Sequence, residues 1–445
     1  MRIVDRTPGI AAGRFAARRA RILEDLGPSA LVVPAGPSRL KNGDTEYRFR
    51  PDSEFLWLTG WGEPEAVLVL RGHAAEDRCV LFVPPRVPEA ELWTGMRLGV
   101  DGACAELGAD AAFPVDEMDS RLADLLDGAE HVYVRLGREP ALDRIVVATL
   151  GSARARASRT GGRPVGVLDP GLLLDEPRLV KDEDELALIR TAAALTVEGF
   201  RAALPRVAAG VGEWEIQAAL EGTFLAGGAW GPAFGTIVAG GAHACTLHYT
   251  RNDARLPQDG WVLIDAGAEV AGYAGDITRA LPVTGRGTPA QRDLHDVVRE
   301  ARDAALAVAR PGATIDDVER AVRDRLEAGL VELGLASRAD AEQRRARLGR
   351  LFPHKSGHWL GLDVHDVGLY RVHGAARTLT PGMVFTVEPG LYVPGDDEQA
   401  PPELRGVGIR LEDDVLITAE GCENLTAALP MDVDGLIALR EGGTA

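Results

Sequence analysis

The stretch DAGAEVAGYAGDITR, residues 265–279, decides how the surrounding chain folds. An apolar segment, GWVLIDAG, enters it and another, ITRALPV, leaves it, with glycines between them, which is the pattern of a β-hairpin. If the turn is centred between Val270 and Ala271, Asp265 and Asp276 face each other with side chains roughly 5 Å apart. Like charges at that distance repel, and a bound cation reverses the sign of the interaction. The alternative is that both acids lie at solvated strand ends.

Three further short, apolar segments carry acids and histidines. They are HKSGHWLGLDVHD (354–366), TVEPGLY (386–392) and GIRLEDD (408–414). The first contains three of the nine histidines of the chain. A single histidine in an apolar stretch is usually a packed core residue, but three of them followed by the acids of EPG and RLED are not easily explained in that way. The cluster therefore indicates a functional site.

Five residues of these segments form a candidate metal centre: Asp265, Asp276, His358, Glu388 and Glu412. Unpaired carboxylates are rarely kept in a low-dielectric interior, and two divalent cations would balance four carboxylates charge for charge. One imidazole with four carboxylates and no thiolate favours Mn2+ over a structural tetrahedral zinc, with Co2+, Fe2+ or Zn2+ as alternatives. Two metals roughly 3.5–4 Å apart can share a bridging hydroxide and polarise a carbonyl, so we predict a two-metal hydrolase.

Length and charge restrict the class of protein. A chain of 445 residues is too long for one ordinary core and predicts two domains. The net charge of -18 argues against nucleic acid or an anionic membrane as partner. No apolar run approaches the roughly 18 residues that span a bilayer, and the N-terminus lacks a signal-peptide core. The four cysteines form no CxxC pair, so we expect a cytoplasmic protein with reduced, buried thiols.

Residues 1–174 are predicted to form a smaller α/β domain on a mixed sheet, because short apolar strands alternate with helical segments. The expected strands are ALVVPAG (30–36), AVLVL (66–70), CVLFVP (79–84) and HVYVRLG (131–137), with helices near 15–26, 120–126 and 141–150. The segment 153–170 is rich in Arg, Gly, Ser and Pro, and we place the domain boundary just after it.

Residues 175–445 are predicted to be α+β. Asp182 is the expected N-cap of a long helix, with Glu185 completing a capping box. Further helices are expected near 213–225, 289–309 and 315–330, with strands TIVAGG, GWVLIDAG, ITRALPV, MVFTVEPGLYV and GIRLEDDVLIT. The segments around Asp265 and Glu388 echo each other, and each is followed by a strand with another acid. A duplicated α+β unit with a pseudo-twofold axis would bring all four acids together.

In their order, these motifs resemble the pita-bread metallopeptidases, and within them the aminopeptidase P (Xaa-Pro aminopeptidase) branch. The likeness extends to CTLHYTRND (245–253), NGDTEYRFRPDSEFLWLTGW (42–61), EPEAVLVL (63–70) and ELWTGMRLG (91–99). It implies a pita-bread fold and hydrolysis of the N-terminal Xaa-Pro bond of peptides, with release of the first amino acid by attack of a metal-bridging hydroxide. The five candidate ligands would hold a dinuclear site in which Asp276 and Glu412 bridge both ions.

The resemblance also implies roles for residues around the metals. His248 and His365 would flank the scissile carbonyl and stabilise the developing oxyanion. His354 would line the pocket for the proline after the cleaved bond. Arg410 would contribute to substrate binding and orient Glu412.

Glu388 would also pass a proton to the leaving prolyl nitrogen. Asp44 and Trp93 match family positions at which a neighbouring subunit reaches the substrate, which suggests a homodimer or homotetramer; their alternatives are a turn residue and a core or interface aromatic. Tyr392 is equally consistent with packing and with a place in the site.

Two alternatives stay open. Prolidase, which cleaves only Xaa-Pro dipeptides, shares the fold, metals and ligands, although Trp359 directly after His358 favours aminopeptidase P. Metal-free relatives such as creatinase-like amidinohydrolases lose the ligands, whereas all five positions are filled here. The stretch GPAFGTIV (231–238) departs from the pattern of the branch, with Phe234 and Gly235 where Ser and Asn are more frequent, so substrate preference is open there.

Overall fold

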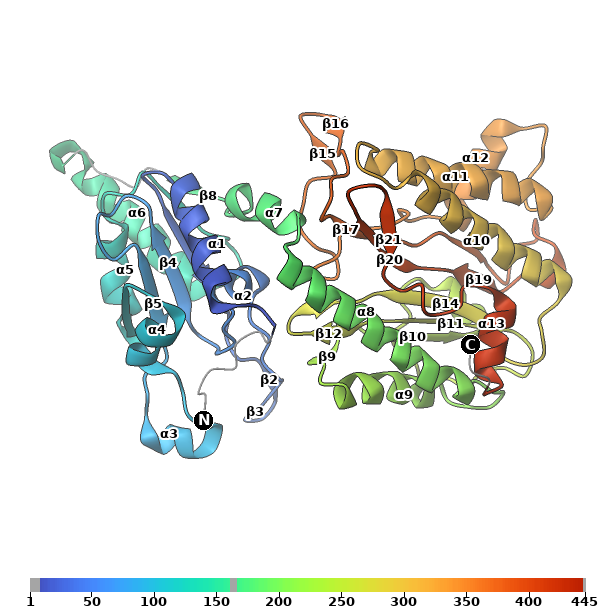
Figure 1. Cartoon of the computed structure of the whole chain (residues 1–445), viewed down its shortest axis with the longest axis horizontal. Helices are drawn as coiled ribbons and strands as arrows, with labels where there is room; N and C mark the ends of the chain where they lie inside the picture. The colour runs from blue at the N-terminus through green and yellow to red at the C-terminus, as the bar shows by residue number, and fades with distance from the viewer. Residues whose placement is uncertain (1–8, 161–165, 443–445) are drawn as a thin grey trace. The chain divides into compact units, whose positions relative to one another are not determined.

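The computed structural model describes residues 9–160 and 166–442, and the chain divides into two compact units, Met1–Pro177 and Arg178–Ala445 (Figure 1). The predicted boundary between residues 174 and 175 remains a proposal, because helix α7 (Gly171–Leu179) runs through this part of the chain. The predicted absence of a signal peptide concerns a segment whose first eight residues lie outside the described ranges. Within those ranges, no helix combines the length and apolar character that crossing a membrane requires.

The N-terminal unit is built on a mixed sheet whose described strands follow the order β6-β5-β4-β1-β7-β8. The strands are β1 (Ala30–Pro34), β4 (Val67–Arg71), β5 (Cys79–Val83), β6 (Ala111–Pro114), β7 (His131–Tyr133) and β8 (Gly166–Leu168). The pairs β1–β4 and β4–β5 are antiparallel, whereas β5–β6 and β7–β8 are parallel and are joined through helices. The predicted α/β domain with a mixed sheet is confirmed.

Helices and a hairpin complete this unit. They are α1 (Ala12–Asp25), α2 (Ser53–Thr59), α3 (Pro88–Thr94), α4 (Gly99–Leu107), α5 (Met118–Leu126), α6 (Pro140–Thr160) and the pair β2 (Leu40–Asn42) and β3 (Thr45–Glu46). Because side chains alternate across a strand, Val32, Val69 and Phe82 share one face of the sheet. They pack there against Leu122 of α5 and Val146 of α6 in one buried cluster.

Residues 153–170, which are rich in Arg, Gly, Ser and Pro, contain regular structure on both sides of residues 161–165. Helix α6 continues to Thr160, and Gly166–Leu168 forms strand β8 at the edge of the sheet; residues 161–165 lie outside the described ranges. Arginine and alanine are good helix formers, so a basic, alanine-rich segment extends a helix as readily as it forms a loop.

The C-terminal unit repeats one arrangement twice. Its first half contains α8 (Glu183–Ala203), α9 (Glu213–Ala226), β9 (Gly231–Pro232), β10 (Ile237–Gly240), β11 (Trp261–Ala266), β12 (Ala268–Val270), β13 (Tyr273–Ala274) and β14 (Ile277–Pro282). Its second half contains α10 (Pro289–Val308), α11 (Ile315–Glu332), α12 (Ala341–Leu351), β15 (Arg371–Val372), β16 (Ala375–Ala376), β17 (Val384–Val387), β18 (Gly390–Val393), β19 (Val407–Arg410), β20 (Asp413–Ile417), β21 (Cys422–Asn424) and α13 (Val433–Arg440).

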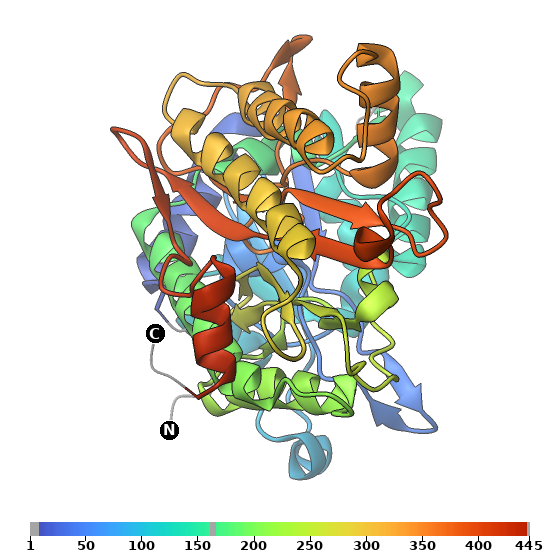
Figure 2. The ribbon, with the colours of Figure 1, turned by 90° about the vertical axis from the view of Figure 1, so that its right-hand side faces the viewer.

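In each half a helix pair packs beside an antiparallel ladder, α8 and α9 with β10-β11-β14, and α10 and α11 with β17-β20-β21. Figures 1 and 2 show the strands between the two helix pairs. A bridge between Thr278 and Glu412 joins the two ladders. The predicted α+β class and the duplicated arrangement are therefore observed.

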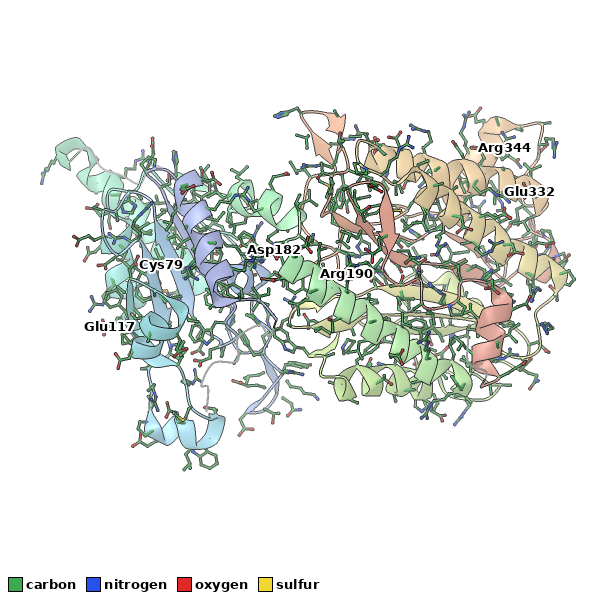
Figure 3. All side chains as sticks on the ribbon, in the orientation of Figure 1. Cys79, Glu117, Asp182, Arg190, Glu332 and Arg344 are labelled. Atoms are coloured by element: carbon green, nitrogen blue, oxygen red, sulfur yellow. The ribbon has the colours of Figure 1, made fainter. Side chains whose placement is uncertain are left out.

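The start of α8 follows from its sequence. The Asp182 side chain accepts a hydrogen bond from the Glu185 backbone N–H at 3.0 Å, and the Glu185 carboxylate accepts one from the Asp182 N–H at 2.9 Å. This is the predicted capping box, which satisfies two helix N–H groups reciprocally. Figure 3 shows Asp182 where this helix begins, with Arg190 further along it.

The hairpin between β11 and β14 turns one residue later than predicted. Ala271 and Gly272 adopt φ of 53° and 91°, the positive values that a tight two-residue hairpin loop requires. As a result Asp265 pairs with Thr278 rather than with Asp276. A shift of two positions preserves the face of the strand, because side chains alternate with a period of two. The two acids therefore stay on the same face, as diagonal neighbours.

His295 gives the C-terminal unit a predictable acid sensitivity. Its side chain on α10 is fully buried, its ring centroid lies 5.7 Å from that of Trp261, and neither ring nitrogen has a hydrogen-bond partner among the described residues. Burial, and then the charge of Arg299, lower the pKa of His295 to about 3. The unfolded chain has a histidine pKa near 6.5, so between these values the unfolded state binds a proton that the folded state does not.

Stability is therefore expected to fall as the pH drops below about 6.5, by about 2 kcal/mol at pH 5 from this group alone. The variant His295→Phe should lose less stability between pH 7.5 and pH 5 than the wild type, as measured by urea unfolding at both values. His373→Asn, which replaces an exposed histidine on the β15–β16 turn, should keep the wild-type dependence. Equal pH dependence in all three proteins would show that His295 is not the responsible group.

Candidate metal centre and active site

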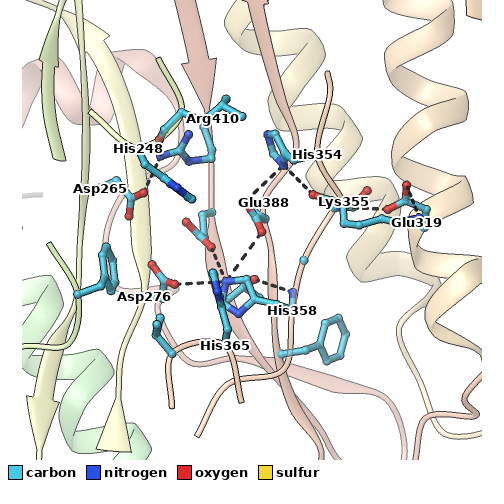
Figure 4. Close-up of a pocket in the computed structure, with 18 of the residues that line it drawn as sticks. His248, Asp265, Asp276, Glu319, His354, Lys355, His358, His365, Glu388 and Arg410 are labelled. Carbon is cyan, nitrogen blue, oxygen red and sulfur yellow. Dashed lines mark hydrogen bonds and ion pairs between the residues drawn. The ribbon is translucent and has the colours of Figure 1, made fainter. Parts of the chain in front are cut away.

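Five predicted ligands converge on one cavity of about 910 Å³ in the C-terminal unit (Figure 4). Asp265 lies on β11, Asp276 directly before β14, Glu388 directly after β17 and Glu412 directly before β20. His358 comes from the segment between α12 and β15. The two antiparallel ladders thus supply the four acids, as we predicted from the duplicated arrangement, and the segment between α12 and β15 supplies the histidine.

The imidazole of His358 lies among three of the acids. Its Nε2 is 3.5 Å from an oxygen of Asp276, 3.9 Å from one of Glu388 and 4.0 Å from one of Glu412. One ligand atom each from Asp276, His358 and Glu412 lie within 4.8 Å of one another, a spacing that a single cation could bridge. Asp265 is held close to this group by Arg410.

The buried acids perturb one another strongly. Burial, and then repulsion from Glu412 and Asp265, raise the pKa of Asp276 well above its ordinary value. Burial and the charge of Glu412 raise the pKa of Glu388 in the same way. The pKa of Glu412 is raised to about 7, by burial first and then by Asp265. Such a cluster is stable in its ionised form only when positive charge compensates it.

Unsatisfied oxygens test whether these residues fit a cation. The Oδ1 atoms of Asp265 and Asp276 are buried and have no hydrogen-bond partner among the described residues. A buried carboxylate oxygen without a partner is costly, and coordination to a metal satisfies it. Because the donor set is four carboxylates and one imidazole, it suits divalent cations that prefer oxygen.

Arg410 has a different partner from the one predicted. Its guanidinium donates to Asp265 Oδ2 at 2.6 Å and to Thr278 Oγ1 at 3.1 Å, while the Thr278 hydroxyl donates to Glu412 Oε2 at 2.7 Å. Arg410 therefore reaches Glu412 only through Thr278, because the guanidinium extends across to β11 instead of along its own strand. It is buried, lines the cavity, and forms an ion pair that orients Asp265.

His354 lines the cavity and contacts the buried Tyr392. The His354 Nε2 is 2.8 Å from the Tyr392 hydroxyl, which also accepts a hydrogen bond from Arg410 at 3.0 Å. Burial lowers the pKa of His354 to about 4, so this imidazole is neutral at physiological pH. Tyr392 is itself buried in an apolar cluster with Ile237 and Leu263, so it packs in the core and its hydroxyl contacts two residues that line the cavity.

His248 and His365 also line the cavity, and both side chains are exposed to it. The His365 ring packs edge-on against His358, with centroids 4.3 Å apart. Burial, and then the nearby charges of His358 and His248, lower the pKa of His365. In Figure 4 the labelled His248 and His365 approach the acids from different segments.

The segment that carries His365 is anchored by its neighbour Asp366. The Asp366 carboxylate accepts hydrogen bonds from Arg178 at 2.7 Å and from Lys181 at 2.9 Å, and all three side chains are buried. The Asp366 backbone N–H donates to the Trp359 carbonyl at 2.9 Å. Trp359 itself is fully buried against Phe385 and serves the core of this unit.

Asp44 and Trp93 are not among the residues that line the cavity of the C-terminal unit. Both belong to the N-terminal unit, Asp44 in the turn between β2 and β3 and Trp93 on α3. Asp44 is exposed, and Trp93 is 86% exposed, so its alternative as a core aromatic is wrong.

Sequence reasoning missed three residues around the metal centre. Thr278 links Arg410 to Glu412, Asp414 accepts a hydrogen bond from the Asp276 backbone N–H at 3.1 Å, and Tyr370 lines the cavity. Thr278 and Asp414 each lie two residues from a predicted ligand, and this spacing places side chains on one face of a strand. That signal was available in the sequence.

Fold and site together define a metal-dependent hydrolase. The chain belongs to metallopeptidase family M24, whose model matches residues 187–419, and the aminopeptidase P N-terminal domain matches residues 15–133. The predicted resemblance to the pita-bread metallopeptidases is thereby confirmed.

Individual relatives match along nearly the whole chain. A Xaa-Pro aminopeptidase from Escherichia coli K12 is 39% identical, over 96% of this chain and 98% of the relative. The solved structure of Pseudomonas aeruginosa aminopeptidase PepP is 40% identical, with a TM-score of 0.93 over 97% of this chain and 98% of its own. A zinc-substituted E. coli aminopeptidase P in complex with product is 39% identical, with a TM-score of 0.92 over 98% and 99% of the two chains.

Proposed function

We propose that this protein is a Xaa-Pro aminopeptidase that removes the first amino acid from peptides with proline at the second position. The observation that carries the proposal is the group of four carboxylates and His358 on one cavity, within a chain that is similar to Xaa-Pro aminopeptidases along almost its full length. The named relatives favour this activity over prolidase.

Asp265, Asp276, His358, Glu388 and Glu412 are the proposed ligands of two divalent metal ions. Mn2+ is the proposed metal because the donor set is rich in carboxylate oxygen and has no thiolate. Such ions supply Lewis acidity and a hydroxide nucleophile at neutral pH. The raised pKa values of Asp276, Glu388 and Glu412 support a site that is completed by positive charge.

The surrounding residues have proposed roles in binding and proton transfer. His248 and His365 donate hydrogen bonds to the carbonyl oxygen as negative charge develops on it. Glu388 would pass to the prolyl nitrogen a proton taken up from the attacking water. His354 and Arg410 line the wall for the proline, and the buried Tyr392 hydroxyl is hydrogen-bonded to both of them.

Proline selectivity has a physical basis. The nitrogen of an Xaa-Pro bond has no N–H, so a peptidase that needs that hydrogen bond cannot use the substrate. Here Phe385, Val364 and Ile237 add apolar surface to the cavity. A ring without a donor fits such a surface without leaving a polar group unsatisfied.

A comparison of peptide lengths tests the proposal against prolidase. The cavity continues past His354 to Ile315, Glu319 and Lys355, which leaves room for residues beyond the proline. We expect the Mn2+-loaded enzyme to cleave Ala-Pro-Ala with a kcat/KM about tenfold or more above that for Ala-Pro, because the added residue contributes binding energy. Ala-Ala-Ala is the control without proline. Cleavage of Ala-Pro alone would identify a prolidase instead.

Location and assembly are also proposals. The acidic chain supports a cytoplasmic enzyme whose partners are peptides, without nucleic acid or membrane. A homodimer or homotetramer is proposed, and exposed apolar side chains around α3, Leu92 at 83% and Trp93 at 86%, support it. Asp44 and Trp93 would then contact substrate at the site of a neighbouring subunit. Light scattering on the purified protein would measure the assembly.

A further inference from the structure

We infer that Glu213 is a positioning residue for His248, and that its buried carboxylate fixes the conformation of the segment 240–254 that carries this histidine. Glu213 is the first residue of α9 and is fully buried. The catalytic part of the inference rests on the proposed function, because His248 acts there on the scissile carbonyl.

The Glu213 carboxylate accepts four hydrogen bonds, two on each oxygen. Oε1 lies 3.0 Å from the Gly240 backbone nitrogen and 3.2 Å from His243 Nδ1. Oε2 accepts from the Tyr249 hydroxyl at 2.9 Å and from the Ala254 backbone N–H at 3.0 Å. A buried carboxylate is tolerated when hydrogen bonds satisfy it, and this set fills both oxygens.

All four donors belong to the segment 240–254. Gly240 ends β10 and Ala254 ends the segment, so one carboxylate holds both of its ends together. The Glu213 backbone N–H also donates to the Ala254 carbonyl at 2.9 Å. Between the ends, His243 and Tyr249 stack with ring centroids 4.4 Å apart, both directed at the same carboxylate. The resulting frame leaves little freedom for the residues between them.

The segment delivers side chains to the cavity. Leu247, His248 and Thr250 line it, and Tyr249, directly after His248, is buried beneath them. The His248 side chain is exposed and has no hydrogen-bond partner among the described residues, while its backbone carbonyl accepts a hydrogen bond from the Thr250 N–H at 3.1 Å. The position of His248 therefore depends on the backbone next to it. Glu213 holds that backbone on one side through Tyr249, and Arg410 donates a hydrogen bond to the Leu247 carbonyl at 3.5 Å on the other side.

Two replacements of Glu213 should lower activity to different extents, because they remove different numbers of its hydrogen bonds. Glu213→Gln keeps one acceptor oxygen but places an NH2 group against two donors, and Glu213→Ala removes both oxygens. We expect kcat on an Xaa-Pro peptide to fall about tenfold in the first and about 100-fold in the second, with KM changed less, because a small displacement of a positioned group is enough to lose that much. Metal content should stay at the wild-type level. Glu215→Ala is the matched control, since Glu215 lies on the same helix and accepts a hydrogen bond from Gly212 N.

A double-mutant cycle separates positioning from general destabilisation. In the His248→Ala background, Glu213→Ala should change kcat by less than about twofold, because the group that it positions is gone. An equal loss of kcat in both backgrounds, or a loss that follows metal content, would overturn the inference.

Hydrogen exchange tests the frame without reference to activity. In Glu213→Gln, the Gly240 and Ala254 amides should exchange faster than in the wild type, while β11 amides stay protected. Thermal melts of both variants establish that they are folded. Unchanged exchange at Gly240 and Ala254 would overturn the inference even if the enzyme is active. A folded, metal-loaded wild type that cleaves no Xaa-Pro peptide would overturn the proposed function, and exchange would still report on the frame.

Discussion

Replacing Glu412 with alanine is expected to remove the metal ions and with them the hydrolysis of Xaa-Pro peptides. Glu412 lies at the junction of the two ladders, where Thr278 bonds its Oε2 and its Oε1 lies 4.0 Å from His358. As a proposed ligand of both ions, it contributes the negative charge that makes the pair of cations favourable. We expect kcat/KM to fall by roughly 10³-fold or more, with metal content measured by mass spectrometry falling in parallel.

The same acid should have the opposite effect on the metal-free protein. Burial and the charge of Asp265 raise the pKa of Glu412 from 4.5 to about 7, so the folded state loses stability as the pH rises from about 4.5 to 7 and stays destabilised above it. Glu412→Gln keeps the shape and removes the charge, and it should raise the free energy of unfolding by about 3 kcal/mol at pH 8 after chelator treatment. With metal present, the order should reverse, because only the wild type gains stability from the ions.

Glu423→Ala is the matched control. Glu423 is a glutamate of the same unit, on β21, and it pairs at the surface with Arg190. Its loss should leave metal content and kcat/KM at wild-type values, since exposed ion pairs contribute little. If Glu412→Ala bound metal as the wild type does, the assignment of Glu412 as a ligand would have to be abandoned.

Features that depend on residues close together in the sequence could be predicted, whereas features that depend on distant residues could not. The Asp182 capping box is formed within four residues, and both of its hydrogen bonds are present. The strands with acids at their ends were predictable because an apolar run next to an acid is a local pattern. The exact hairpin turn was not, because Ala271 adopts a positive φ beside Gly272, and alanine gives no local sign of that conformation.

Hydrogen bonds between residues far apart in the sequence could not be predicted from local patterns. Arg410 bonds Asp265, 145 residues away, and Glu213 bonds Tyr249 across 36 residues. No periodicity encodes such a pairing, because it depends on how two elements are brought together in the fold. The proposed metal ligands are also distant from one another in the sequence. Their convergence could still be predicted, because buried carboxylates need compensating positive charge and a shared pair of cations provides it.

Replacing His365 with alanine is expected to lower kcat by roughly 10²–10³-fold while the metal ions remain bound. His365 lines the cavity and packs against His358 at 4.3 Å, but it is not one of the proposed ligands. Its side chain would donate to the oxyanion only as charge develops, so kcat should fall more than KM rises. Asp366, anchored by Arg178 and Lys181, should hold the backbone in place in the variant.

Two comparisons make this expectation specific. His365→Gln retains a donor of different reach and should recover part of kcat, whereas His373→Asn, at an exposed turn, should behave as the wild type. Steady-state kinetics on Ala-Pro-Ala with metal content measured on the same samples gives both quantities. Full activity in His365→Ala would remove this residue from the oxyanion role. A fall in kcat that follows metal loss would instead show that His365 acts by supporting the ligand His358, since the two rings are in contact.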